Sequence, residues 1–183
     1  MRESQRAAEL CRQMLAYASK GNLMTQPLEV SALVAEMVPL LKRSISSKAV
    51  LDYRFAKNLP SIEGDAKQIR ELIMNLVVNA FEAIGEKEGR VTLAVDAKGC
   101  NQRFLPENLP EGKYVVVEVR DTGCGMNPAI RERIFEPFFT TKFNDRGLGL
   151  AAAAGIARAH GGDIKIYSQA GRGTTFTVFL PAC

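Results

Sequence analysis

A single predicted helix, residues 66–84, limits what this chain can fold into more than any other segment. Five polar side chains share a stripe about 80° wide at 100° per residue, and apolar side chains cover nearly all of the remaining helix surface. The stripe comprises Gln68, Glu71, Asn75, Asn79 and Glu82. Asp65 and Gln68 match the capping box that starts a helix. A helix with so much apolar surface must be mostly buried, so the fold has to cover it on most sides.

The rest of the sequence predicts short helices and short strands in mixed order. Helices are expected at residues 4–20, 31–44, 128–134 and 148–160, and extended segments at 27–30, 50–55, 91–95, 114–119, 164–167 and 175–180. Ser31 is positioned to cap the second of these helices, and Pro39 predicts a kink or an early break in it. Because helices and strands do not alternate strictly, the pattern favours an α+β fold in which helices cover one face of one sheet.

Composition and charge exclude several classes of protein. The chain has 183 residues, of which 46% are hydrophobic and 24% are charged, as expected for one globular domain and not for a disordered or fibrous chain. Its net charge of +4 is too small to indicate a nucleic-acid partner, and no apolar run reaches the roughly 18 residues that span a bilayer. The four cysteines lie far apart and the chain has one histidine, so neither a zinc site nor a disulfide framework is predicted. We expect a cytoplasmic protein.

The polar stripe of the long helix needs partners if the helix is buried. Asn75 and Asn79 lie one turn apart and offer neutral oxygen ligands, which Mg²⁺ accepts together with phosphate oxygens and water. Asparagine is a mediocre helix former, so two of them in mid-helix favour a functional role. The alternative is that the stripe is simply a solvated face.

Two glycine-rich segments have the pattern of ligand-binding loops. Asp121 follows a predicted strand, and Gly123 and Gly125 after it allow a sharp turn and a close approach to a ligand. A carboxylate at that point can accept a hydrogen bond from an exocyclic amine such as that of adenine. Gly147 and Gly149 open the last predicted helix, whose free N–H groups suit a phosphate. Taken alone, the first segment could be a plain turn and the second a tight helix entry.

The stretch between these two segments has the pattern of an anchored lid. Phe135, Phe138 and Phe139 precede a polar loop that ends in glycine. Lys142 and Arg146 of this loop could reach anionic phosphates. Taken singly, these residues could equally be a core patch and solvated charges.

The four features occur in the order of the N box, first glycine box, F box and second glycine box of a known ATP-binding domain. The chain resembles the domain shared by sensor histidine kinases, the gyrase B subunit, ninety-kilodalton heat-shock chaperones and mismatch-repair ATPases. The likeness covers roughly residues 25–181, and Gly171 to Phe176 is similar to the final glycine-threonine motif of the kinases. Each box alone is a weak signal, whereas the ordered set is specific.

The resemblance implies a Bergerat-type two-layer α/β sandwich, with a mixed sheet, helices on one face, and ATP between the N-box helix and the lid. It implies that Asn79 binds Mg²⁺ and that Asp121 holds the adenine amine. The positions that match cofactor-binding residues are Asn79, Asp121, Gly123, Gly125, Gly147, Gly149, Leu150 and Thr174. Asn75, Lys142 and Arg146 take the catalytic positions, where they would assist at the phosphates. Phosphoryl transfer needs mainly positioning and charge neutralisation, which such a site supplies.

Three departures from the family pattern refine this expectation. The loop between Lys142 and Gly147 is short, so it would close little of the site. Asn75 stands where the gyrase-like ATPases hold a glutamate that activates water, which disfavours efficient hydrolysis and favours transfer to a protein acceptor. The phosphorylatable histidine of a dimerising hairpin is not recognised, and residues 1–20 resemble the end of the second helix of that hairpin. We therefore expect residues 21–183 to form the catalytic domain of a truncated kinase.

The leading hypothesis is a protein histidine kinase domain that uses ATP and Mg²⁺ to phosphorylate a histidine on an upstream dimerisation domain. The expected partners are that domain and a response-regulator receiver domain, within a homodimeric, full-length phosphoprotein that is cytoplasmic or membrane-anchored. The alternatives are a gyrase-like ATPase and a regulatory module that binds ATP without transfer. His160, the single histidine, ends a helix before two glycines, so a structural role is expected for it.

Overall fold

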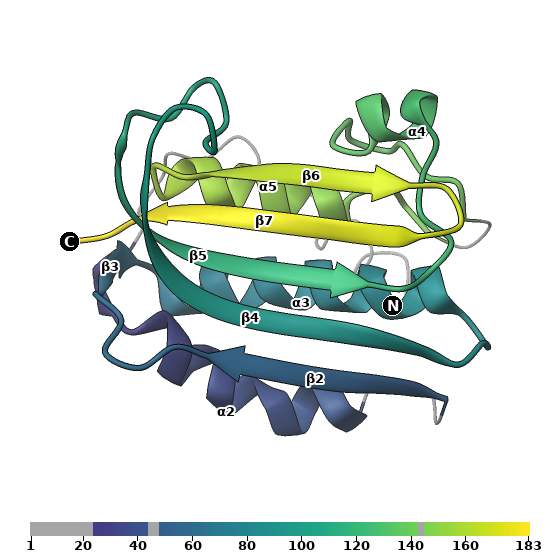
Figure 1. Ribbon diagram of the computed structural model, residues 1–183, viewed down its shortest axis with the longest axis horizontal. Coiled ribbons are helices and arrows are strands. Elements are labelled where there is room, and N and C mark those ends of the chain that lie inside the picture. The colour runs from purple at the N-terminus through teal and green to yellow at the C-terminus, as the bar shows by residue number, and fades with distance from the viewer. Residues whose placement is uncertain (1–23, 44–47, 143–144) are drawn as a thin grey trace, which may run out of the picture.

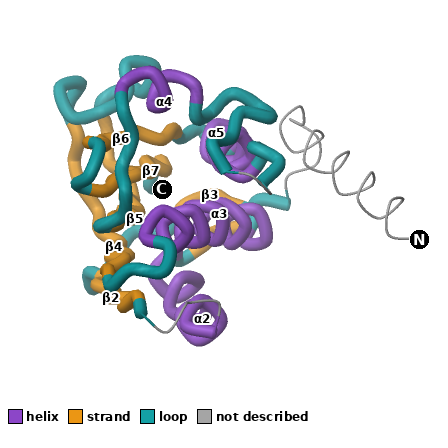
Figure 2. The backbone as a smooth tube through the Cα atoms, turned by 90° about the vertical axis from the view of Figure 1, so that its right-hand side faces the viewer, coloured by secondary structure: helices purple, strands orange, loops and turns teal. Residues whose placement is uncertain are grey.

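The computed structural model describes residues 24–43, 48–142 and 145–183, so the predicted helix at residues 4–20 lies outside the described residues. In chain order the described elements are β1 (Gln26–Leu28), α2 (Val30–Arg43), β2 (Ala49–Phe55), β3 (Ile62–Gly64), α3 (Ala66–Ile84), β4 (Gly89–Cys100), β5 (Gly112–Asp121), α4 (Pro128–Arg133), α5 (Gly149–Ala159), β6 (Asp163–Gln169) and β7 (Gly173–Pro181). Helices α2, α3 and α5 lie on one face of the main sheet (Figure 1 and Figure 2). The predicted fold class, a two-layer α/β sandwich with helices on one face, is confirmed.

The main sheet has five strands and is mixed. Its strand order is β2-β4-β5-β7-β6, with β2 parallel to β4 and the other neighbouring pairs antiparallel. Two parallel neighbours need a crossover connection, and here the chain returns from β2 to β4 through β3 and α3. Helix α3 is therefore part of the connection between two neighbouring strands of the main sheet, and its apolar surface packs against that sheet.

The main core lies between α3 and the sheet. Leu72, Leu76 and Val77 of α3 belong to the same buried cluster as Val117 and Phe176 of the sheet. Burial of side chains of this size stabilises the fold by about 1.5–3 kcal/mol each. Seven residues of α3 are buried, which confirms that the long helix is mostly covered. None of the helices in the described ranges is both long and apolar enough to cross a membrane.

Helix α2 differs from the prediction in its start near Ser31 and in its continuation past Pro39. The helix begins at Val30, so Ser31 lies inside the first turn and is not the cap, and its hydroxyl donates to the Glu29 carboxylate at 3.0 Å. The predicted cap is therefore wrong by two residues. The predicted early break at Pro39 is also wrong, because α2 continues through this residue for 14 residues in total, whereas the alternative, a kink, stays a prediction. Pro39 is exposed, and on the solvent side the carbonyl that loses its N–H partner can be hydrated.

The strands of the main sheet are all longer than the sequence predicted, whereas β1 is shorter than predicted and β3 was not predicted. β4 has 12 residues, and its polar second half, with Asp96 and Lys98, pairs with Val116 and Tyr114 of β5. Pairing with a buried neighbour outweighs the low strand propensity of these residues. The three-residue β3 is also absent from the prediction; within the described ranges it pairs with the equally short β1, and segments of three residues carry little periodicity.

His160 joins the start of α3 to the end of α5. The Asp65 N–H donates to His160 Nε2 at 3.0 Å, so Nδ1 carries the ring proton and donates to the Ile156 carbonyl at 2.8 Å. The side chain is 9% exposed. Both ring nitrogens are therefore engaged in holding two helices together, and the predicted structural role is confirmed.

Candidate functional site

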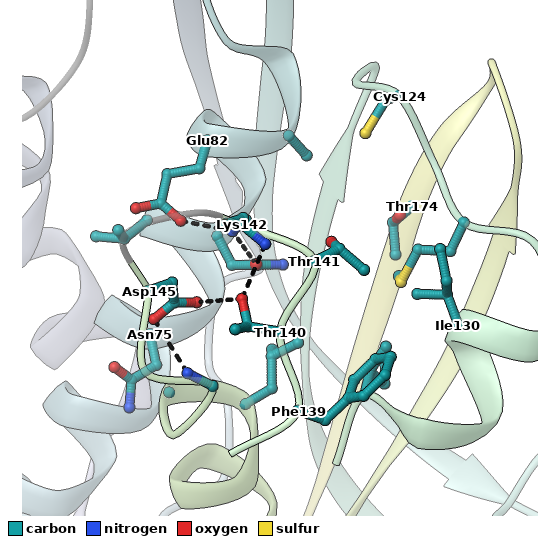
Figure 3. Close-up of a pocket in the computed structure, with 18 of the residues that line it drawn as sticks. Asn75, Glu82, Cys124, Ile130, Phe139, Thr140, Thr141, Lys142, Asp145 and Thr174 are labelled. Carbon is teal, nitrogen blue, oxygen red and sulfur yellow. Dashed lines mark hydrogen bonds and ion pairs between the residues drawn. The ribbon is translucent and has the colours of Figure 1, made fainter. Parts of the chain in front are cut away.

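A pocket of about 440 Å³ lies where α3 faces the start of α5. Its wall also includes the turn after β5, α4, the segment that leads into α5, and the start of β7. In Figure 3, Ile130, Phe139 and Thr174 lie on one side of the pocket, and Asn75 and Glu82 lie on the other. The predicted site residues in the wall are Asn75, Asn79, Gly125, Lys142, Gly147, Gly149, Leu150 and Thr174. The pocket therefore brings together residues from all four sequence boxes.

The polar stripe of α3 forms one side of the pocket. Asn75, Asn79 and Glu82 all line it, so the stripe is not merely a solvated face. A Cβ added at Gly149 would lie 3.6 Å from Asn75 Oδ1, which shows how closely the start of α5 approaches this helix. Lys142 reaches across to α3, with its Nζ 2.8 Å from Asn79 Oδ1.

Asp121 lies behind the pocket wall, and one of its two carboxylate oxygens has no hydrogen-bond partner in the described part of the chain. The side chain is 2% exposed, and its Oδ1 accepts hydrogen bonds from the N–H groups of Gly123 at 2.7 Å and Thr174 at 3.3 Å. Among the described residues, Asp121 Oδ2 is the one buried side-chain oxygen or nitrogen without a hydrogen-bond partner. A buried acceptor of this kind is costly unless a ligand or an ordered water molecule donates to it. Its chemistry fits the exocyclic amine of adenine.

Each of the two glycines of the first box allows a different close approach between backbone segments. Gly125 has a φ of +61°, and a Cβ there would lie 2.0 Å from the Gln169 carbonyl oxygen. A Cβ at Gly123 would lie 2.5 Å from the Ala83 carbonyl. Gly125 thus lets the turn pass against the β6–β7 hairpin, and Gly123 lets it pass against the end of α3.

The segment before α5 is organised by its own side chains. Asp145 Oδ1 accepts hydrogen bonds from the N–H groups of Arg146 at 2.6 Å and Gly147 at 3.3 Å. Gly147 has a φ of +64°, and its carbonyl accepts a hydrogen bond from the Phe138 N–H at 2.9 Å. The N-cap residue Leu148 makes no side-chain capping bond, so the first N–H groups of α5 remain available at the pocket.

Three predicted residues, Asp121, Gly123 and Arg146, do not lie in the wall itself, and several wall residues were not predicted. Gly123 packs on α3, and Arg146 is exposed outside the wall. The unpredicted wall residues include Val78, Glu82, Ala83, Met126, Ile130, Ile134, Thr140, Thr141 and Asp145. Glu82 could have been found from its place on the polar stripe. Ser168 carried no sequence signal, yet its Oγ accepts the Met126 N–H at 2.9 Å and lies 2.9 Å from Thr174 Oγ1.

The stability of the ligand-free protein should depend on the charge of Asp121. Burial raises the pKa of Asp121 above its ordinary value of 3.8, against a smaller lowering by the N–H groups of Gly123 and Thr174. The folded protein therefore takes up this proton at a higher pH than the unfolded chain. Between the raised pKa and 3.8, falling pH should stabilise the wild type relative to Asp121→Asn, by at most about 1.4 kcal/mol per pH unit. Urea unfolding of both proteins from pH 7 to pH 4 measures this difference; an opposite trend would mean that hydrogen bonding outweighs burial.

The sequence matches one known family over residues 64–183, described as histidine kinase-, DNA gyrase B-, and HSP90-like ATPase. These residues include the whole pocket wall. The chain belongs to this ATPase family. Sensor kinase CckA of Brucella abortus (strain 2308) is 39% identical to it over an alignment 184 positions long, which covers 96% of this chain and 19% of CckA. Sensor histidine kinase ZraS of Escherichia coli (strain K12) is 30% identical over an alignment 182 positions long, which covers 98% of this chain and 36% of ZraS. The chain thus spans between about a fifth and about a third of these relatives.

Solved structures of histidine kinases share the fold of this ATPase family member. Full-length ShkA in complex with AMPPNP aligns with a TM-score of 0.77 at 26% identity, covering 100% of this chain and 37% of ShkA. The nucleotide-free catalytic domain of histidine kinase ThkA aligns with a TM-score of 0.69 at 27% identity, covering 88% of this chain and 97% of that domain. The resemblance to the ATP-binding domain of sensor histidine kinases is therefore confirmed.

The residues in and behind the pocket wall suit ATP by their chemistry, and the amide oxygens of Asn75 and Asn79 are of a kind that Mg²⁺ accepts. The unpartnered Asp121 Oδ2 suits an amine donor, and the free N–H groups at the start of α5 suit phosphate oxygens. The described residues contain no cluster of three His, Cys, Asp or Glu side chains that would hold a metal by themselves. Mg²⁺ does not need such a cluster, because it often binds through one or two protein oxygens together with substrate phosphates and water.

Proposed function

We propose that this chain is the catalytic domain that binds ATP with Mg²⁺ and directs the γ-phosphoryl group to a histidine on an upstream dimerisation domain. The observation that carries the proposal is the unpartnered, buried Asp121 Oδ2 behind the wall of a pocket lined by all four boxes. ATP binding is also supported by ShkA, a protein of the same fold that was solved with AMPPNP.

The adenine end of the site is assigned to Asp121 and Thr174. Ionised Asp121 accepts the adenine amine and cannot donate to a guanine carbonyl, which selects ATP over GTP. Thr174 lines the pocket and keeps Asp121 Oδ1 oriented through its N–H. Gly123 and Gly125 shape this part of the wall by close backbone packing.

The phosphate end is assigned to α3 and the segment before α5. Asn79 is the metal ligand, Asn75 assists beside it, and the N–H groups around Gly149 and Leu150 bind phosphate oxygens. Bound Mg²⁺ would neutralise charge on the phosphates of ATP and help to orient them for transfer. Lys142 contacts the phosphates, and Arg146 approaches them from outside the wall in the same role.

The remaining parts of the proposal concern the longer protein. We assign residues 1–20 to the end of a dimerisation hairpin and residues 21–183 to the catalytic domain. The partners are that hairpin, a second copy of the full-length chain, and the receiver domain of a response regulator. This assignment is supported by the sensor-kinase relatives, of which the chain covers 19% and 36%. The proposal also places the catalytic domain in the cytoplasm and makes the full-length protein a phosphoprotein.

The isolated chain should bind ATP with Mg²⁺ and fail to phosphorylate itself. His160 is buried with both ring nitrogens engaged, and the 11 residues of α5 separate it from the phosphate end by about 15 Å at 1.5 Å per residue. In-line transfer needs reacting atoms about 3–3.5 Å apart. Incubation with γ-labelled ATP should therefore leave the chain unlabelled, and the dimerisation hairpin of the full-length protein, supplied in trans, should become labelled. Acid-labile label on His160, or no label on the hairpin, would contradict the proposal.

A further inference from the structure

The ammonium group of Lys142 contacts Asn79 Oδ1, the oxygen proposed to bind the metal. Lys142 Nζ lies 2.8 Å from Asn79 Oδ1. It also lies 2.6 Å from Glu82 Oε2, and Figure 3 shows the Lys142 and Glu82 side chains next to each other. Asn79 and Glu82 are three residues apart on α3, so both side chains project from the same face of the helix. The ammonium thus replaces the positive charge that a metal would bring to Asn79.

Glu82 supplies the countercharge that keeps the ammonium there. Asn79 offers only a neutral amide oxygen, whereas Glu82 forms an ion pair with Lys142. The Lys142 side chain is 34% exposed and the Glu82 side chain 51% exposed, so water can replace either partner at modest cost. The Lys142 N–H is bonded to Thr140 Oγ1 at 3.0 Å, so the ammonium can change place through its side-chain torsions while this backbone contact remains.

We propose that Glu82 is a positioning residue that makes nucleotide binding depend on the metal. The inference rests on the proposed function and concerns the regulation of the same site. Mg²⁺ and the Lys142 ammonium cannot both contact Asn79 Oδ1, because like charges at that distance repel. When ATP arrives with its metal, Lys142 leaves α3 for the phosphates. When ATP arrives without a metal, Glu82 retains Lys142 and its own charge repels the phosphates.

The test compares the affinity for a fluorescent ATP analogue, TNP-ATP, with Mg²⁺ and with EDTA. Glu82→Gln should tighten metal-free binding roughly two- to fivefold, which is the range of an exposed ion pair, and should change binding with Mg²⁺ less. Glu86→Gln is the matched control, because Glu86 is exposed just after α3 and lies outside the pocket wall. This control should leave both affinities unchanged. Circular dichroism melting of each variant establishes that it is folded.

A double-mutant cycle separates action through Lys142 from direct repulsion by Glu82. In a Lys142→Met background, Glu82→Gln should have less than half of its effect on metal-free binding. An undiminished effect in this background would overturn the proposal, and so would an unchanged metal dependence in Glu82→Gln alone. If the wild type binds TNP-ATP under neither condition, the proposed function itself fails. Tight binding by the wild type with unaltered metal dependence in the variant refutes only the role of Glu82.

Discussion

Gly125→Ala is expected to lower the free energy of unfolding by about 2–5 kcal/mol and to abolish ATP binding. A left-handed backbone costs an L-residue about 1–2 kcal/mol, and a core overpacked by one methyl costs about 1–3 kcal/mol more. The added Cβ would lie 2.0 Å from the Gln169 carbonyl oxygen and 2.7 Å from its carbon. Both neighbours are backbone atoms of the β6–β7 hairpin, so no side-chain rotation can relieve the contact. The turn that carries Asp121 would have to move, and the pocket with it.

Gly171→Ala provides a matched control for this change. Gly171 has a φ of +75°, yet nothing lies within 4 Å of a Cβ placed there. Its substitution should therefore cost only the left-handed term, about 1–2 kcal/mol, and preserve ATP binding. Urea unfolding of the wild type and both variants measures the difference. Equal losses of stability for the two variants would show that the close approach at Gly125 is not the cause.

Asn79→Ala should remove most of the gain in ATP affinity that Mg²⁺ provides. The change deletes the protein oxygen assigned to the metal, and loss of one contact to a charged group costs about 1.5–3 kcal/mol, or roughly 10- to 150-fold in affinity. Calorimetric titration with ATP, in Mg²⁺ and in EDTA, measures this gain for each protein. Gln68→Ala is the control, because Gln68 belongs to the same stripe but not to the pocket wall. An unchanged Mg²⁺ dependence in Asn79→Ala would contradict the assignment of the metal.

Local patterns account for the parts of the fold and site that the sequence predicted. The burial of α3 follows from its own apolar periodicity, and its start follows from Asp65, whose side chain accepts the N–H groups of Lys67 and Gln68. Gly125 and Gly147 both have a positive φ, which glycine adopts freely and other residues rarely do. These requirements concern neighbouring residues, so one stretch of sequence is enough to reveal them.

Contacts between distant segments account for what the sequence could not predict. Lys142 and Glu82 are 60 residues apart, and nothing in either stretch alone indicates that they form an ion pair. Ser168 and Met126 are 42 residues apart, and a serine in a strand carries no signal that it holds the first glycine box. The long second half of β4 depends on pairing with β5 and not on its own composition. Tertiary context decided each of these features.

The path of the chain through α3 has a consequence for where this folding unit begins. The family match starts at residue 64, just before α3, but β2 lies upstream of that point and is the edge strand that pairs with β4. Helix α2, also upstream, contributes Leu33 and Met37 to the same core as α3. A fragment cut at the family boundary would expose one side of α3 and one edge of β4. We therefore expect the smallest independently stable piece to be larger than the matched family segment, because α3, which lines the pocket, also connects to a strand upstream of that segment.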